Sequence, residues 1–250
     1  MPSRILVIGQ RLAAGTVAEA VPTRVLDEDE AEAFFGRGSM LHLMFRALKA
    51  NNDWTETWAV ALDDLVAGVT AAGTVSFGGA VTTAGTLNLY IAGQRVRVGV
   101  ATTDAAADVA TNVAAAIVAT TDLPVTAAVN GVTDTQVDIT ARHKGEAGNG
   151  IDLRVNHYPG EYTPAGLTVT FGAMANGAGN PDLADAIAVL GEQWYTDWIQ
   201  PYTDSANLVA LETELADRFG PMVMQDGHAY TAAAATHAAL TTLGNARNSP

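Results

Sequence analysis

The segment from Arg142 to Gly150 has the composition most suggestive of chemistry. It reads Arg-His-Lys-Gly-Glu-Ala-Gly-Asn-Gly. A basic head followed by three glycines could hold an anion, because backbone N–H groups that converge on one point form a nest for negative charge. The alternative is a structured loop between two strands, with glycines at positions of positive φ. The residue types favour the structured loop and leave anion binding open.

Histidine is the second residue type that could do chemistry. His228 follows Asp226 by two positions, and His237 comes later in the same region. Metal ligands on a helix favour a spacing of three or four residues, and no pair of carboxylates accompanies these histidines. With no cysteine in the chain, thiolate chemistry and disulfides are excluded. We therefore expect no metal site and no cofactor.

The hydroxyl and carboxyl groups show no hydrolase pattern. None of the serines lies in a G-x-S-x-G context, and the sequence has neither a Walker A nor a G-x-G-x-x-G motif. Ser39 and Ser205 are instead placed to begin helices. The neighbouring carboxylates Asp63 and Asp64 more simply end a strand. We therefore expect no catalytic residue, no cofactor-binding residue and no enzyme activity.

Four large aromatic residues, Trp194, Tyr195, Trp198 and Tyr202, could form a platform for a ligand. Large aromatic side chains at the edge of a buried strand more often belong to a core or an interface. We favour the core or interface interpretation.

The composition limits the class of protein. The chain has 250 residues, of which 48% are hydrophobic and 16% charged, and its formal net charge is -14. This is enough for one large domain or two small ones. The acidity argues against nucleic-acid binding, which needs clustered Lys and Arg. The longest apolar stretch, from Trp58 to Gly73, is interrupted by Asp63 and Asp64, so we expect no membrane insertion.

Patterns at the two ends of the chain predict alternating strands and helices. The opening predicts a strand at Arg4–Gly9, helices from Glu28 (with Asp27 or Asp29 as cap) and from Ser39, and a strand at Trp54–Leu62. The closing part predicts a helix beginning at Asn180-Pro181, a strand at Trp194–Tyr202, a helix from Thr203 or Asp204 to Phe219, a strand at Pro221–Gln225 and a helix at Thr231–Leu243.

Between these ends, alternation replaces helical periodicity. The middle predicts a hairpin of Leu87–Ile91 with Arg95–Val100, a helix capped by Thr103-Asp104 and running to about Thr120, and strands at Val125–Val129, Gln136–Ala141, Ile151–Asn156 and Leu167–Phe171. The fold class is therefore α/β: a wound sheet core formed by 1–65 and 176–250, interrupted by a β-rich α+β insert at 66–175 that projects outward. A wound chain normally follows its last helix with a further strand, so we expect a fragment of a longer polypeptide.

Several segments together resemble the contractile tail sheath protein of Mu-like bacteriophages. The segments that carry the resemblance are Pro2–Leu12, Arg142–Arg154, Gly177–Asp182, Gly191–Tyr195, Pro201–Asp204 and Asp226–Tyr230. The resemblance covers almost the whole chain and is carried by the order and spacing of these segments together.

The resemblance implies a structural virion protein whose core is subtilisin-like by fold only. Such subunits form hexameric rings that stack into a helical sheath around a tail tube, contact baseplate proteins, and contract to drive the tube through the host envelope. Localisation would be the virion tail, and the host cytoplasm during assembly. By itself the present chain is expected to be monomeric or weakly associating. The alternative is a ligand- or receptor-binding module carried by the β-rich insert, with the Arg142–Gly150 loop as its candidate site.

Overall fold

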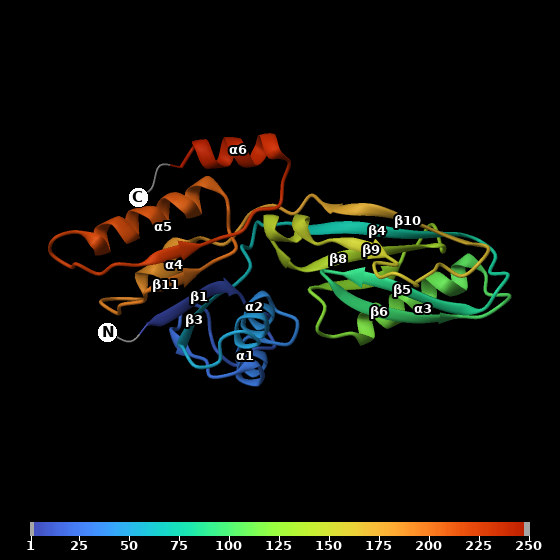
Figure 1. Ribbon diagram of the computed structural model, residues 1–250, viewed down its shortest axis with the longest axis horizontal. Coiled ribbons are helices and arrows are strands. Elements are labelled where there is room, and N and C mark those ends of the chain that lie inside the picture. The colour runs from blue at the N-terminus through green and yellow to red at the C-terminus, as the bar shows by residue number, and fades with distance from the viewer. Residues whose placement is uncertain (1–2, 248–250) are drawn as a thin grey trace. The chain divides into compact units, whose positions relative to one another are not determined.

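Two compact units make up the chain in the computed structural model, which describes residues 3–247 (Figure 1). Unit one consists of residues 1–65 and 180–250, and unit two of residues 66–179. These bounds lie close to the ranges 1–65, 176–250 and 66–175 drawn from the sequence. That the middle segment projects outward stays a prediction.

Unit one is built on a five-stranded sheet. Its strand order is β12 (His228–Tyr230), β11 (Asp197–Ile199), β1 (Arg4–Gln10), β3 (Glu56–Leu62) and β2 (Thr23–Arg24). All neighbours are parallel except β2, which runs antiparallel to β3 at one edge. The chain extends the sheet from β1 first toward β3 and later toward β11. The carboxyl end of β1 is therefore the point where the winding direction reverses.

Helices cover both faces of this sheet. They are α1 (Glu28–Phe35), α2 (Met40–Lys49), α4 (Leu183–Ala188) and α5 (Ser205–Phe219), followed by the exposed α6 (His237–Asn245). Ile5 and Val7 of β1 pack in one cluster with α1 and α2 side chains such as Phe45. Leu6 and Ile8 pack in the other cluster, with α4 and α5. The continuous apolar run of β1 is thus explained, because a strand covered on both faces needs no polar side.

Unit two contains two antiparallel sheets and one helix. The first sheet has the order β10 (Leu167–Ala175), β4 (Thr70–Gly79), β8 (Gln136–Lys144) and β7 (Val125–Val129), and the second the order β6 (Gln94–Val100), β5 (Gly85–Ile91) and β9 (Leu153–Val155). The helix α3 (Ala106–Ala119) buries Val109, Val113 and Ile117 in the core that both sheets share. The predicted hairpin of β5 and β6 is confirmed, with Ala92 and Gly93 at positive φ in its turn.

Three local predictions are wrong. Pro221–Gln225 is a turn, not a strand, because Met224 has a φ of 57° and its N–H donates to the Gly220 carbonyl; the strand comes later, as β12. Neither Asn180 nor Pro181 begins a helix, since α4 is capped by Asp182. Asp104 does not cap α3, because its carboxylate accepts the N–H of Ala101 and the N-cap is Ala105.

Two further elements differ from their predicted extents. The strand expected across Trp194–Tyr202 is limited to β11, and the last helix begins at His237 rather than Thr231. Across residues 3–247, no helix combines the length and the apolar character that crossing a bilayer requires.

Candidate functional site

The side chains of Arg142, Lys144 and Asn149 bind the chain's own backbone. β8 ends at Lys144, and a short 3-10 turn, η1 (Glu146–Gly150), follows. Arg142 Nε donates to the Leu123 carbonyl at 2.8 Å, and Lys144 Nζ donates to the Val66 carbonyl at 2.8 Å. The basic groups that suggested an anion site are therefore engaged internally, and the geometry favours the structured-loop interpretation.

Asn149 fastens this turn to the segment that leaves unit two. Its Nδ2 donates to the Gly177 carbonyl at 2.9 Å, while its Oδ1 accepts the Gly177 N–H at 2.8 Å. The side-chain amide thus completes both hydrogen bonds that a neighbouring strand would offer. A Cβ placed on Gly148 would lie 2.9 Å from Ala71 Cβ and 3.0 Å from Ala141 Cβ, and one on Gly177 would collide with the Gly145 carbonyl oxygen. These two glycines are required by close packing.

A small backbone ladder completes the arrangement. Val69 donates its N–H to the Ala178 carbonyl at 2.8 Å, and the Val69 carbonyl accepts the N–H groups of Gly145 and Ala178, each at 3.1 Å. Segments 66–69, 144–149 and 177–178 are therefore tied together where the chain enters and leaves unit two. We call these three segments the neck clamp.

A second polar network lies in unit one, at the carboxyl ends of its parallel strands. Gln10 Nε2 donates to Asp64 Oδ1 at 2.7 Å. Arg11 contacts both oxygens of Asp63, at 2.7 and 3.2 Å. The two neighbouring carboxylates therefore have separate partners and end β3, as predicted.

A further polar cluster lies at the N-terminus of α5. Asp204 accepts the backbone N–H of Asn207 at 3.0 Å, the side chain of Asn207 at 2.8 Å and that of Asn180 at 2.7 Å. Burial works to raise the pKa of Asp204, but these hydrogen bonds outweigh it and hold the pKa below its usual value. Asn207 also accepts the N–H of Leu183, which joins the starts of α4 and α5. We call Asn180, Asp204 and Asn207 the root network.

Two buried polar groups close to this network have no hydrogen-bond partner among the residues described. They are Gln200 Nε2 and Tyr202 Oη. Burial, followed by the negative charges of Asp64 and Asp204, raises the pKa of Tyr202 far above its usual value. Tyr202 is therefore a neutral core side chain.

Two of the other three aromatic candidates also belong to the core. Tyr195 and Trp198 are buried, and the guanidinium of Arg218 lies 5.3 Å from the centre of the Trp198 ring. Trp194 is half-buried and donates its Nε1–H to the Asp226 carbonyl at 2.7 Å. The core interpretation of this aromatic group is supported.

The remaining candidate residues are dispersed. Ser39 is the N-cap of α2 and accepts the N–H of His42, and Ser205 is the first residue of α5, so both begin helices as predicted. His228 and His237 are exposed in β12 and α6. Across residues 3–247, no three His, Asp or Glu side chains are placed to hold a metal ion together. The expected lack of catalytic activity stays a prediction.

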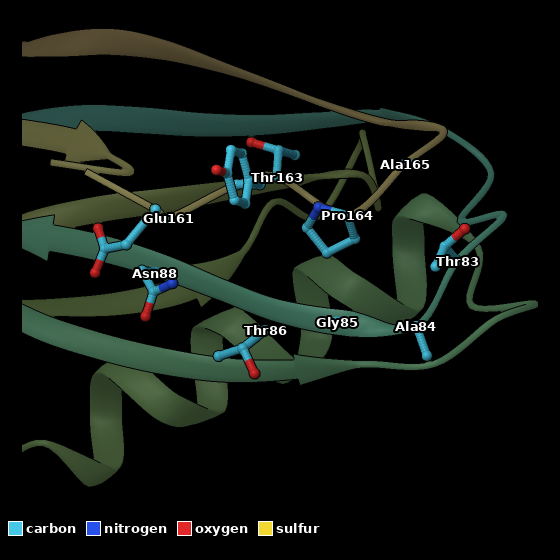
Figure 2. Close-up of a pocket in the computed structure, with 11 residues that line it drawn as sticks. Thr83, Ala84, Gly85, Thr86, Asn88, Glu161, Thr163, Pro164 and Ala165 are labelled. Carbon is cyan, nitrogen blue, oxygen red and sulfur yellow. The ribbon is translucent and has the colours of Figure 1, made fainter. Parts of the chain in front are cut away.

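Unit two also has a groove that sequence reasoning did not single out (Figure 2). It has a volume of about 510 Å³ and lies between the start of β5 and a loop that precedes β10. Its lining residues are Thr83, Ala84, Gly85, Thr86, Asn88, Gly160, Glu161, Tyr162, Thr163, Pro164 and Ala165. The sequence offered one signal for this groove: the Pro- and Gly-containing loop between Asn156 and Leu167, to which the predicted strands assigned no function.

The carboxylate of Glu161 is fixed at one end of this groove. Its oxygens accept the Tyr90 hydroxyl at 2.6 Å and the Tyr158 N–H at 3.2 Å, and Arg95 lies 3.6 Å away. Desolvation works to raise the pKa of Glu161, but the hydrogen bonds and the Arg95 charge hold it below its usual value. The group is therefore a fixed negative charge at neutral pH.

Comparison with known proteins gives one clear relative. No family model matches the chain. A protein of Haemophilus influenzae described as "Mu-like prophage FluMu tail sheath protein" is 41% identical over 245 residues, which are 98% of this chain and 50% of the relative. The chain thus spans about half the length of that relative.

Two solved structures also match. A sheath tail protein from Listeria innocua is 12% identical and has a TM-score of 0.33 over 87% of this chain and 44% of its own. A sheath tail protein from Desulfitobacterium hafniense is 14% identical and has a TM-score of 0.35 over 92% of this chain and 49% of its own. TM-scores this low do not establish that the two structures share the fold of this chain.

Proposed function

This chain is a relative of the Mu-like phage tail sheath proteins, and from that relation we propose that it is part of a structural subunit of a contractile tail sheath. The observation that carries the proposal is the 41% identity across 98% of the chain. An identity of that level over nearly the whole chain covers both units, and not merely a shared local motif.

The internal construction of each unit is compatible with a mechanical role. A subunit that moves between two lattices must keep its own shape while its outer contacts change. Unit one has a sheet packed on both faces and a root network that joins the starts of α4 and α5. Unit two has one shared core and a neck clamp that ties its entering and leaving segments. Each unit is thus suited to move as a rigid body.

The finer proposal follows the resemblance. Subunits would assemble into hexameric rings stacked as a helical sheath around the tail tube, joined to baseplate proteins, and contraction would drive the tube through the host envelope. Unit one would be the subtilisin-like core by fold, and unit two the outward insert. The protein would act in the virion tail after assembly in the host cytoplasm, without enzymatic activity.

Electron microscopy of the full-length parent polypeptide tests this proposal. We expect rings or tubes of uniform diameter. A parent polypeptide that stays monomeric at high concentration, over a range of salt and in the presence of its tail tube protein, would contradict it.

A second candidate function is ligand binding by unit two. The observation that favours it is the groove beside Glu161, not the Arg142–Gly150 loop, whose basic groups already bind backbone carbonyls.

A further inference from the structure

The groove exists because β5 is longer than one of its neighbours. β6 pairs with β5 along its whole length, from Gly85 to Ile91. β9 pairs only with Leu89–Ile91, and one further bond, from Asn156 N–H to the Asn88 carbonyl, ends that side of the ladder. Beyond it the chain turns into the 157–166 loop. Gly85, Thr86 and Asn88 of β5 therefore form the floor of an open groove, in which Pro164 faces Gly85 (Figure 2).

The loop that forms the opposite wall is held by its own hydrogen bonds. Asn156 Nδ2 donates to Thr163 Oγ1 at 2.9 Å. The N–H and the hydroxyl of Thr82 donate to the Ala165 carbonyl at 2.8 and 3.0 Å. Together with the bonds to Glu161, these contacts fix the wall before any ligand arrives. A preorganised wall lowers the entropy cost of binding.

Several polar groups in the groove remain available. Within residues 3–247, the side chains of Thr83, Thr86 and Asn88 form no hydrogen bond with the protein. Thr163 accepts from Asn156, so its own hydroxyl proton can be donated to a ligand. The amide of Asn88 offers two donors and one acceptor. The ring of Tyr162 is 76% exposed and supplies an aromatic surface.

The charge of the lining narrows the ligand class. Glu161 is the one charged residue of the lining. Arg95, beside the groove, is paired with Glu161, so a phosphate or carboxylate ligand would find no positive charge in the lining itself. A single carboxylate that already accepts two hydrogen bonds is a poor site for a divalent cation. The hydroxyl groups of the lining and the amide of Asn88 also disfavour a lipid tail, because an apolar ligand would bury them without hydrogen bonds.

We propose that this groove binds a neutral polyhydroxylated ligand, and that the ligand class is a saccharide. Neighbouring sugar hydroxyls can donate to and accept from Asn88 and the threonine side chains, while the apolar face of the sugar ring covers Tyr162. The volume of about 510 Å³ lies in the range of small-molecule sites. The proposal does not rest on the sheath role, because it is argued only from contacts within unit two.

The test is a titration of the ¹⁵N-labelled 250-residue chain with glucose, galactose, N-acetylglucosamine and lactose, each followed by NMR. At least one sugar should shift the amide signals of 85–88, 160–163 and Ala165 in a saturable manner. Asn88→Ala and Tyr162→Ala should each weaken that binding about tenfold, the free energy of roughly one lost hydrogen bond or ring contact. Tyr230→Ala, which removes an exposed tyrosine in unit one, is the matched control and should leave the affinity unchanged.

Three outcomes would overturn the proposal. One is the absence of saturable shifts with all four sugars at high millimolar concentration. Another is an equal response to inorganic phosphate or calcium chloride, which would indicate a charge-driven site. The third is sugar binding that neither Asn88→Ala nor Tyr162→Ala weakens. None of these results bears on sheath assembly, so failure here is distinguishable from failure of the proposed function.

Discussion

Two glycine-containing loops of unit two use their polar groups in opposite ways. In the 142–150 loop, the Arg142, Lys144 and Asn149 side chains all bind backbone groups of the same unit. In the 157–166 loop and the facing start of β5, internal bonds hold the backbone, while Asn88, Thr86 and the Tyr162 ring stay open. A glycine-rich polar loop is therefore identified as a clamp or a binding wall by following its hydrogen bonds, not by its composition.

The largest expected effect comes from adding one methyl group to the clamp. In Gly177→Ala the new Cβ would collide with the Gly145 carbonyl, and because that partner is backbone, the whole clamp must shift. We expect a loss of about 2–3 kcal/mol in the free energy of unfolding, measured by urea denaturation. Gly131→Ala is the control, since a Cβ there meets nothing within 4 Å. Equal stability of the two variants would show that the clamp is not closely packed.

Removing the Asn149 amide breaks the clamp without adding atoms. Asn149→Ala leaves the N–H and the carbonyl of Gly177 without their partner, at an expected cost of about 1–2 kcal/mol. Hydrogen exchange at the Gly177 and Ala178 amides should accelerate. The comparison variant is Asn88→Ala in the groove, which we expect to leave stability unchanged. If Asn88→Ala were the more destabilising, the assignment of the two loops would have to be reversed.

Acid should weaken the root network in unit one. The folded-state pKa of Asp204 is lowered, so its contribution to stability is complete above the unfolded pKa of about 3.9 and is lost as the pH falls through the folded pKa. Asp204→Asn should lower stability at neutral pH by about 1 kcal/mol, because Asn180 and Asn207 would lose a charged acceptor. The substitution should also flatten the decline of stability in acid. Unfolding free energies between neutral pH and pH 3 check this. An unchanged acid slope in the variant would contradict it.

The smallest effect is expected where a polar group has no partner. Tyr202 Oη is buried and unbonded within the described part of the chain, so Tyr202→Phe removes a desolvation cost and little else. Stability should stay the same or rise by up to about 1 kcal/mol in thermal or urea unfolding. A clear loss would reveal a hydrogen bond, for example through an ordered water.

Local signals in the sequence sufficed for much of the fold. The apolar run of β1, the caps Asp27 and Ser39, and the β5–β6 hairpin are set by residues that lie close together in the chain. The predictions were wrong where contacts with residues distant in the sequence determine the local structure. Asn180 looks like a helix cap, yet its amide is taken by Asp204, which is remote in sequence. Met224 adopts a positive φ that no propensity scale anticipates.

The Arg142–Gly150 segment and the groove show the same contrast between local and long-range information. The Arg142–Gly150 segment was visible in the sequence, but its role depends on bonds to Val66 and Gly177, far away along the chain. The groove was not visible, because it arises from the unequal lengths of β6 and β9 beside β5. A sequence pattern indicates which residues could act, and long-range pairing determines which of their groups remain free.

The central claim, that this chain is part of a tail sheath subunit, is tested most directly by cryo-electron microscopy of phage particles whose tails contain the full-length parent polypeptide. The account predicts a helical layer around the tail tube in which units one and two fit as separate rigid bodies. A layer that accommodates neither unit, or a tail in which the polypeptide lies outside the sheath, would contradict it.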